Sequence, residues 1–306
     1  MKLLRDLVSL PDELRGGALT IGNFDGVHLG HARLIDRLVA RARALSGPAV
    51  VFTFDPHPVR LLRPERAPWP LTWTERKARL LEQLGVDWII AYPTDEKLLQ
   101  LSDRDFFRQI VRDKMAARAM VEGPNFFFGH NRTGNIDVLA KLTAAEGMRL
   151  EIVEPVVIDG AIVSSSRVRD LIAAGNVDQA RRLLTQPYCI RGIVTHGAGR
   201  GARIGFPTAN LAGIDTLLPS PGVYAGRARL AGESFAAAIN IGPNPTFGEQ
   251  ELKVEVHLID FHRAIYGEPL EVDFVSRLRD VRPFSGVEEL KQQLSRDVAA
   301  ARNAPR

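Results

Sequence analysis

Short apolar runs and amphipathic stretches alternate through the first 180 or so residues. The apolar runs predict β-strands at residues 18–22, 49–54, 86–92, 118–121 and 150–153. The stretches between them predict helices at about residues 30–45, 73–84, 102–115 and 134–146, and Ser102 with Asp105 has the spacing of an N-terminal cap. Strands that alternate with helices need crossover connections. This half therefore predicts an α/β domain with a Rossmann-like, mostly parallel sheet and helices on both faces.

The pattern changes after about residue 186. Val254, Val256 and Leu258 alternate with Glu255 and His257, which is the period of two expected for a half-buried strand. Helical periodicity returns only near the end, where residues 285 and 288 have capping-box spacing. This half predicts a small antiparallel β-barrel with a terminal helix, built from strands at residues 188–195, 222–230, 233–241, 252–260 and 271–278.

Between the halves, residues 176–187 predict a short helix followed by a boundary marked by proline. We expect one domain over residues 1–185 and a second over residues 186–306.

Composition and charge narrow the class of protein. Of the 306 residues 45% are apolar and 25% charged, as in a globular protein, and no apolar run is long enough to predict a membrane span. The N-terminus lacks the apolar core of a signal peptide, and the single cysteine, Cys189, excludes an internal disulfide, so we expect a cytoplasmic protein. The net charge is +4, but the basic residues are scattered among acids, and we expect no nucleic-acid partner.

The first candidate site follows the strand that ends at Ile21. Residues 22–31 carry glycines at 22, 26 and 30, and His28 and His31 share one face at the start of a helix. A helix N-terminus binds anions, and two imidazoles can donate hydrogen bonds to phosphate oxygens. An ordinary helix with one surface and one half-buried histidine, or a zinc-binding pair, remains an alternative.

A second helix start carries hydroxyl and guanidinium groups. Ser164, Ser165 and Ser166 are followed by Arg167 and Arg169. Hydroxyls at this position are usually simple N-caps, but with two arginines the segment can also bind a triphosphate through charge-assisted hydrogen bonds.

The second candidate site is the glycine-dense segment 192–210. Such a loop can wrap phosphates with backbone N–H groups, although it can also be an ordinary flexible loop. Thr208 and Asn210 are two apart in an extended segment, so they point the same way and offer oxygen ligands suited to Mg²⁺.

Residues 28–31 and 163–169 resemble the His-x-Gly-His and Ile-Ser-Ser-Thr-x-x-Arg signatures of the nucleotidylyltransferase superfamily, with Val163 and Ser166 in place of the isoleucine and threonine. Together with residues 52–58 and 123–129 they resemble the FMN adenylyltransferase module of prokaryotic bifunctional FAD synthetases. The resemblance implies that His28 and His31 contact the ATP phosphates. It implies that the following residues bind the nucleotide: Gly22, Phe24, Asp25, Gly26, Gly30, Asn125, Ser164, Ser165, Ser166 and Arg169. It places Phe54, Asp55, Pro56 and His57 near the flavin. Many relatives carry Asp at the position of Asn125.

Residues 205–210 are similar to the Gly-x-Pro-Thr-Ala-Asn core of the riboflavin kinase module, and residues 221–225, 240–247 and 254–257 follow in the family's order. Glu255 matches the family's catalytic carboxylate, although by alternation alone it would be an ordinary solvent-facing residue. The resemblance implies that Thr208 and Asn210 bind Mg²⁺, that Arg279 lies near the flavin or phosphates, and that the nucleotide contacts Gly197, Gly199, Gly201, Gly205 and Pro207.

The two resemblances together imply an enzyme with two activities, one phosphorylating riboflavin to FMN and one adenylylating FMN to FAD, with ATP and Mg²⁺ in both. Two alternatives remain: a flavin-binding regulator without turnover, and a related nucleotidylyltransferase acting on another phosphate ester. The sequence predicts no oligomeric state.

Overall fold

The computed structural model describes residues 1–243 and 252–305. By its internal contacts the chain divides into two compact units. We call Met1–Pro68 with Thr74–Ser164 the sheet unit, and Trp69–Trp73 with Ser165–Arg306 the barrel unit. The domain boundary expected after residue 185 stays a prediction. Residues 244–247, part of the motif at 240–247, lie outside the described residues.

The sheet unit contains a parallel six-stranded sheet in the order β1-β4-β3-β2-β5-β6. All the predicted strands of this half are present, and the additional edge strand β1 has only three residues, too few to show a period. The strands are β1 (Lys2–Leu4), β2 (Ala18–Ile21), β3 (Ala49–Phe54), β4 (Trp88–Tyr92), β5 (Ala119–Glu122) and β6 (Arg149–Ile152).

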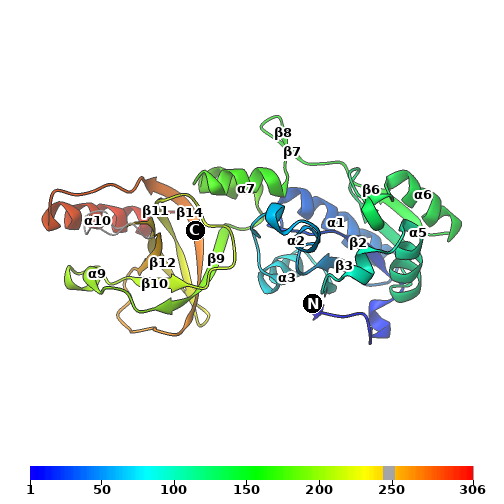
Figure 1. Cartoon of the computed structure of the whole chain (residues 1–306), viewed down its shortest axis with the longest axis horizontal. Coiled ribbons are helices and arrows are strands. Elements are labelled where there is room, and N and C mark those ends of the chain that lie inside the picture. The colour runs from blue at the N-terminus through cyan, green and yellow to red at the C-terminus, as the bar shows by residue number, and fades with distance from the viewer. Residues whose placement is uncertain (244–251, 306) are drawn as a thin grey trace. The chain divides into compact units, whose positions relative to one another are not determined.

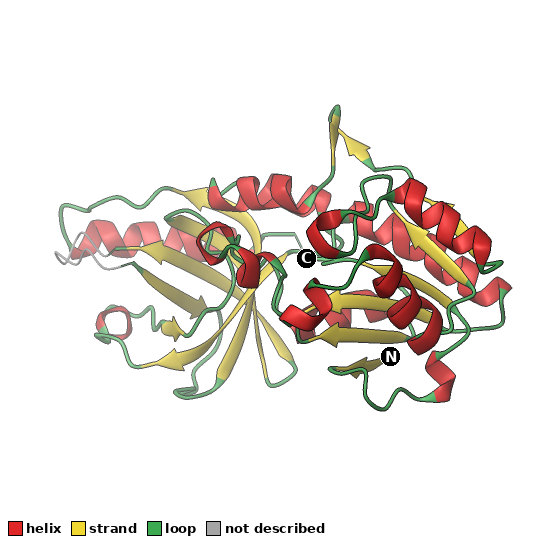
Figure 2. Ribbon diagram, turned by 45° about the vertical axis from the view of Figure 1, so that its right-hand side comes forward, coloured by secondary structure: helices red, strands yellow, loops and turns green. Residues whose placement is uncertain are grey.

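Helices cover both faces of this sheet (Figure 2), as the alternation of side chains along β3 requires. Val50 and Phe52 pack with Phe106 and Ile110 in one core cluster. Val51 packs in another cluster with apolar side chains of helix α1. The predicted helices are confirmed as α1 (Leu29–Ala44), α3 (Thr74–Gln83), α5 (Asp103–Phe106) continuing as the π-helical η3 (Phe107–Lys114), and α6 (Ile136–Ala145).

Short elements complete the sheet unit. They are η1 (Asp12–Leu14), α2 (Val59–Leu62), η2 (Pro64–Arg66), α4 (Glu96–Leu99), η4 (His130–Arg132) and the hairpin β7 (Val157–Ile158) with β8 (Ala161–Ile162).

The order of strands reverses beside β2, since β3 lies on one side of it and β5 on the other. The pairing of β2 with β5 ends at Leu19 and Met120, and further along the backbone N–H of Ile21 donates instead to the Glu122 carboxyl at 2.8 Å. The Glu122 side chain thus replaces the backbone hydrogen-bond partner of Ile21 where β2 and β5 separate. In parallel α/β sheets ligands bind outside the carboxyl ends of the strands at this position.

The barrel unit is a closed antiparallel barrel in the order β10-β13-β12-β11-β14-β9. The predicted strands are confirmed, and the four-residue β10 was missed because it lies behind the glycine-dense loop. The strands are β9 (Tyr188–Thr195), β10 (Ala209–Ala212), β11 (Gly222–Leu230), β12 (Glu233–Gly242), β13 (Lys253–Leu258) and β14 (Pro269–Arg279).

The barrel unit also contains α7 (Ser165–Ala173), α8 (Val177–Leu183), α9 (Arg200–Arg203) and the terminal α10 (Val287–Arg302). Helix α8 confirms the short helix predicted near residue 176. Helix α10 runs beside β11 and β12 (Figure 1), and its Ala301 packs with Ala225 and Ile259.

One predicted cap is confirmed and one is wrong. The Ser102 hydroxyl accepts the Asp105 backbone N–H at 3.0 Å, as predicted. At α10 the N-cap is Gly286, and Ser285 donates from its N–H and its hydroxyl to Glu289, at 3.0 and 2.7 Å, rather than pairing with Glu288. The helix thus begins one residue later than predicted, and the carboxylate that faces Ser285 is that of Glu289 instead of Glu288.

Candidate active sites

The first site is formed by the tight loop between β2 and α1. Phe24, Gly26 and Val27 all have positive φ, at 47°, 85° and 42°. A β-branched residue rarely adopts this conformation, and it persists here because Val27 and Phe24 are buried. The loop is therefore a fixed structure that determines where Asp25 and the start of α1 lie.

The two histidines are arranged as a stacked pair. His28 is the N-cap of α1, and its Nδ1 accepts the His31 backbone N–H at 3.3 Å. The rings stack with centroids 3.6 Å apart and planes 17° apart. Because its Nδ1 accepts a hydrogen bond, the neutral form of His28 carries its proton on Nε2.

The electrostatic surroundings keep His31 neutral. Burial, then the neighbouring His28 and Lys77, lower the pKa of His31 well below its usual 6.5. Among the described residues, His31 Nδ1 and Asn23 Oδ1 are buried without a hydrogen-bond partner. The His31 imidazole thus offers hydrogen bonds rather than positive charge, and the neighbourhood has unmet hydrogen-bonding capacity.

Gly30 allows the chain before the serine triplet to approach α1. A Cβ at Gly30 would lie 3.0 Å from the His28 ring and 3.4 Å from the Val163 carbonyl oxygen. The structure therefore brings the predicted segment at 163–164 next to the histidine pair.

Helix α7 begins at Ser165, as expected of a helix start rich in hydroxyls, but it belongs to the barrel unit. There Arg169 donates from Nε to the Trp69 carbonyl at 3.0 Å. The nucleotide contacts expected of Ser165, Ser166 and Arg169 stay predictions.

The residues expected near the flavin follow β3. Phe54 packs edge-on against Phe52 at 5.4 Å. The Asp55 carboxylate accepts from the Thr74 hydroxyl and, at 3.5 Å, from Arg5. His57 Nδ1 accepts the Val59 backbone N–H at 3.1 Å. Gly22 and Asn125 follow the carboxyl ends of β2 and β5, where Asn125 is exposed. All these residues thus follow strand ends on the side where parallel sheets bind ligands.

Two buried ionisable residues near this site were missed in the sequence. Lys77 on α3 is 7% exposed and donates to the Thr53 hydroxyl at 3.4 Å. Glu122 at the end of β5 is 2% exposed, and burial raises its pKa well above 4.5. The signal for Lys77 was its position on the apolar face of a helix, next to Ala78 and Leu81.

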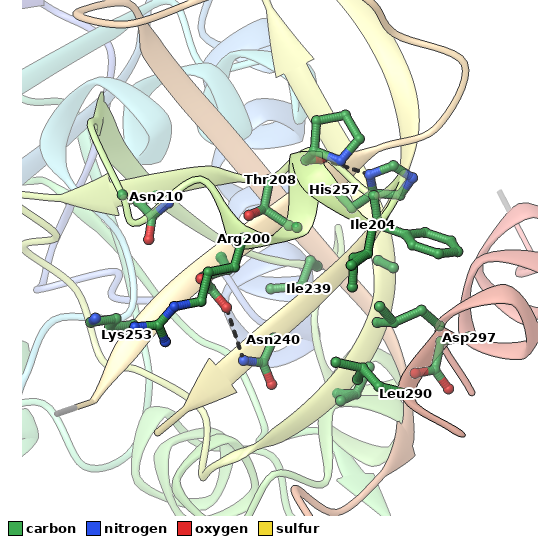
Figure 3. A pocket seen from close by; sticks show the side chains of 18 of the residues that line it. Arg200, Ile204, Thr208, Asn210, Ile239, Asn240, Lys253, His257, Leu290 and Asp297 are labelled. Atoms are coloured by element: carbon green, nitrogen blue, oxygen red, sulfur yellow. Dashed lines mark hydrogen bonds between the residues drawn. The ribbon is translucent and has the colours of Figure 1, made fainter. Parts of the chain in front are cut away.

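The second site is a hollow of about 220 Å³ in the barrel unit. Strand register places Asn210 of β10 and Asn240 of β12 on either side of Glu255 of β13. Asn240 Nδ2 donates to Glu255 Oε2 at 3.3 Å (Figure 3). The lining includes all the residues predicted for this site except Gly205: Gly197, Gly199, Gly201, Pro207, Thr208, Asn210, Glu255 and Arg279.

The glycine-dense loop passes too close to its surroundings for larger residues. A Cβ at Gly197 would lie 2.2 Å from the Asn210 amide, and one at Gly201 would lie 2.3 Å from the Phe206 carbonyl oxygen. Gly199 and Gly205 have φ of 66° and 92°. The end of the loop is attached to β13, since His257 Nδ1 lies 2.7 Å from the Pro207 carbonyl (Figure 3). These contacts fix the chain next to Thr208, which lines the same hollow as Glu255.

The predicted magnesium ligands fit the ion. Thr208 and Asn210 both line the hollow and offer a hydroxyl and an amide oxygen, the hard donors that Mg²⁺ prefers. No group of three or more His, Cys, Asp and Glu residues that could hold a metal occurs in the described parts of the chain. Mg²⁺ that is bound together with a nucleotide usually has few protein ligands, and phosphate oxygens supply further ones.

Arg279 lines the same hollow but is held by protein groups. Its guanidinium forms an ion pair with Asp297 at 2.8 Å and lies over the Phe284 ring. Gln293 donates to the same carboxylate at 2.8 Å. The guanidinium is thereby fixed at the wall of the hollow, and its contact with flavin or phosphate stays a prediction.

No helix in the part of the chain that the structure describes is long and apolar enough to cross a membrane.

Comparisons with known proteins divide the chain in the same way. Residues 10–167 match the FAD synthetase family model, and residues 184–304 match the riboflavin kinase model. Two bifunctional riboflavin kinase/FMN adenylyltransferases are similar over 99% of this chain and 97% of their own: that of Pseudomonas fluorescens is 38% identical and that of Escherichia coli K12 is 34% identical. A solved structure from Streptococcus pneumoniae, described as a macrolide-efflux protein, is 30% identical, with a TM-score of 0.88 over 99% of both chains.

Proposed function

The chain belongs to the family of bifunctional riboflavin kinases/FMN adenylyltransferases, and we propose from this premise which residues carry its two reactions. It is an enzyme that phosphorylates riboflavin to FMN and adenylylates FMN to FAD. The FAD synthetase match covers the strands of the parallel sheet except the edge strand β1, and the riboflavin kinase match covers the barrel, so each reaction has its own region of the chain.

In the barrel unit, Glu255 is the general base. It takes the proton from the ribityl 5′-hydroxyl as that oxygen bonds to the γ-phosphorus of ATP, and ADP leaves with the electrons of the broken bond. The observation that supports this is the row of Asn210, Glu255 and Asn240, in which the carboxylate lies opposite Asn210, one of the two predicted metal ligands. A base of this kind accelerates its step by roughly 10²–10⁴-fold.

The remaining residues of the barrel site bind and align the substrates. Thr208 and Asn210 hold Mg²⁺, which when bound neutralises charge on the phosphate oxygens. The loop of Gly197, Gly199, Gly201, Gly205 and Pro207 wraps the nucleotide phosphates with its backbone. Arg279 contacts the flavin or its phosphate. Alignment matters here because phosphoryl transfer depends mainly on positioning and charge.

In the sheet unit, His28 and His31 donate hydrogen bonds to the ATP phosphates at the start of α1. An FMN phosphate oxygen attacks the α-phosphorus of ATP in line, and pyrophosphate leaves. No base is needed, since a phosphate monoester with a second pKa of about 6 is already ionised at neutral pH. The nucleotide contacts proposed in the sheet unit are Gly22, Phe24, Asp25, Gly26, Gly30, Asn125 and Ser164, and the flavin contacts are Phe54, Asp55, Pro56 and His57. Ser165, Ser166 and Arg169, proposed for the nucleotide from the resemblance, belong to α7.

The substrates are therefore riboflavin, FMN and ATP, and the expected compartment is the cytoplasm, which suits a chain with a single, buried cysteine.

The test is a time course with purified protein, riboflavin, ATP and Mg²⁺, followed by separation of the flavins by chromatography. We expect FMN to appear first and FAD to follow with release of pyrophosphate. Riboflavin that binds but is never converted would contradict the proposal and favour a flavin-binding regulator.

A further inference from the structure

Lys77 connects helix α3 to the loop that follows β2. Its side chain is 7% exposed, and its ammonium donates to the Thr53 hydroxyl at 3.4 Å. The Thr53 hydroxyl in turn donates to the Asn23 carbonyl oxygen at 3.2 Å. Lys77 thus lies at the carboxyl end of β3, next to the loop that leads to the histidine pair.

Lys77 interacts electrostatically with two acidic residues and with one histidine. Burial lowers the pKa of Lys77, whereas the negative charges of Asp25 and Asp55 act in the opposite direction and favour the protonated ammonium. The charge of Lys77 also helps to keep His31 neutral. Lys77 therefore interacts electrostatically with Asp25 and His31, which are proposed for the nucleotide, and with Asp55, which is proposed for the flavin.

Several polar groups here have unmet hydrogen-bonding capacity. Within the described residues the hydrogen bond to Thr53 is the one polar contact of the Lys77 ammonium, which has three donors. Asn23 Oδ1 and His31 Nδ1 are buried without partners in the same part of the structure. Buried polar groups are normally satisfied, so this arrangement indicates a polar ligand.

We propose that Lys77 is a catalytic residue of the adenylyltransfer site and that its ammonium binds the phosphate of FMN as this phosphate attacks ATP. The reaction brings two anions together, and a neutral His31 cannot compensate their charges. A fixed cation between them lowers this repulsion and stabilises charge in the transition state. The phosphate oxygen bonds to the α-phosphorus, and the bond to the bridging oxygen breaks as pyrophosphate leaves with the electron pair. This proposal rests on the function proposed above.

The test compares three full-length variants with the wild type in FMN adenylylation. Lys77→Met keeps the length of the side chain and removes its charge, and we expect kcat/KM for FMN to fall by about 10²–10³-fold, with a raised KM for FMN. Lys77→Arg keeps the charge, and we expect a smaller loss. Lys97→Met is the matched control, because Lys97 is an exposed lysine on α4 of the same unit, and we expect wild-type kinetics.

A second readout separates phosphate binding from a merely structural role. Lumiflavin, which lacks the ribityl phosphate and cannot be phosphorylated, serves as a competitive inhibitor against FMN. We expect its Ki to be the same in wild type and Lys77→Met while the KM for FMN rises. A Ki that rises together with the KM for FMN would overturn the proposal, as would adenylylation within threefold of wild type.

Two controls keep the outcomes distinct. If Lys77→Met fails to fold by circular dichroism, the comparison of Ki with KM is made on Lys77→Gln, with the same expected and contradicting results. A wild-type protein that forms no FAD contradicts the proposed function itself, independently of Lys77. Formation of FMN from riboflavin by the barrel unit is expected to remain unchanged in every variant.

Discussion

The two sites differ in the groups that they offer to the same kind of co-substrate. The sheet unit offers a stacked pair of histidines and a buried lysine around a tight loop. The barrel unit offers a carboxylate held by an amide on the neighbouring strand, beside a hydroxyl and a second amide. A buried lysine lies near the first site together with the acidic Asp25 and Asp55, whereas a carboxylate lines the hollow of the second.

The difference between the groups in the two sites matches the difference between the nucleophiles of the two reactions. The ribityl hydroxyl is a neutral alcohol, so its attack on ATP requires a proton acceptor, which Glu255 supplies. The FMN phosphate has already lost its protons near neutral pH, so its attack requires compensation of charge. The comparison predicts that substitutions in one site stop one reaction and leave the other nearly unchanged.

The largest effect is expected for Glu255→Gln. Removal of the base is expected to lower the rate of FMN formation by roughly 10²–10⁴-fold, with conversion of supplied FMN to FAD within about twofold of wild type. Both rates are measured by chromatography of the flavins. Glu233→Gln, an exposed glutamate of β12, is the matched control and is expected to behave as wild type. Loss of both activities in a folded Glu255→Gln protein would contradict the assignment of the two reactions to two separate sites.

The opposite effect is expected for His28. Because His28 is also the N-cap of α1, Asn is the better replacement, since it retains the cap and removes the imidazole. We expect FAD formation by His28→Asn to fall by about 10²-fold, within the range for loss of one transition-state donor, and FMN to accumulate from riboflavin. His130→Asn, at an exposed histidine of the same unit, is the control. Equal FAD formation by both variants would remove His28 from the mechanism.

A smaller effect is expected for Asn240→Ala. Its amide donates to the Glu255 carboxylate, and a hydrogen bond to a charged group contributes about 1.5–3 kcal/mol. Because this bond is long, at 3.3 Å, we take the low end of that range and expect FMN formation to fall about tenfold. Adenylylation of FMN serves as the internal control in the same preparation. An unchanged kinase rate would show that Glu255 is positioned without Asn240.

The smallest effect is on stability and concerns the sheet unit alone. The pKa of Glu122 is raised in the folded protein, so its protonated form stabilises the fold fully below about 4.5, and this contribution is lost as the pH rises toward the folded pKa. Glu122→Gln is neutral at every pH and can still accept the Ile21 N–H. We therefore expect the midpoint of thermal unfolding of the variant, minus that of wild type, to increase from pH 5 to pH 8. A constant difference would contradict a raised pKa.

The alternation of apolar and polar residues predicted most of the fold. The strands of the parallel sheet, such as β3, were predicted from continuous apolar runs, and the helices between them carry apolar faces. The period of two is clear in β13 of the barrel. Strand β1 was missed because three residues show no period, and β10 was missed because it lies directly behind the glycine-dense loop. The π-helical turn of η3 was not predicted either, since its hydrophobic pattern fits an α-helix.

The candidate sites were predicted where a local motif carries the chemistry. The glycine-dense loop and the histidine pair are contiguous in sequence, so their residue types indicate phosphate binding directly. The role of Asn240 depends on the register of β12 against β13, and that of Lys77 on how α3 packs against β3. Neither relation is encoded in a short segment, so both became visible only in the folded chain.

The most direct test of two separate sites is complementation in one tube. Glu255→Gln and His28→Asn are each incubated with riboflavin, ATP and Mg²⁺, alone and as an equal mixture, and FAD is measured over time. We predict little FAD from either variant alone and substantial FAD from the mixture, because FMN made by one protein is adenylylated by the other. A mixture that forms no more FAD than the two variants separately would contradict the account.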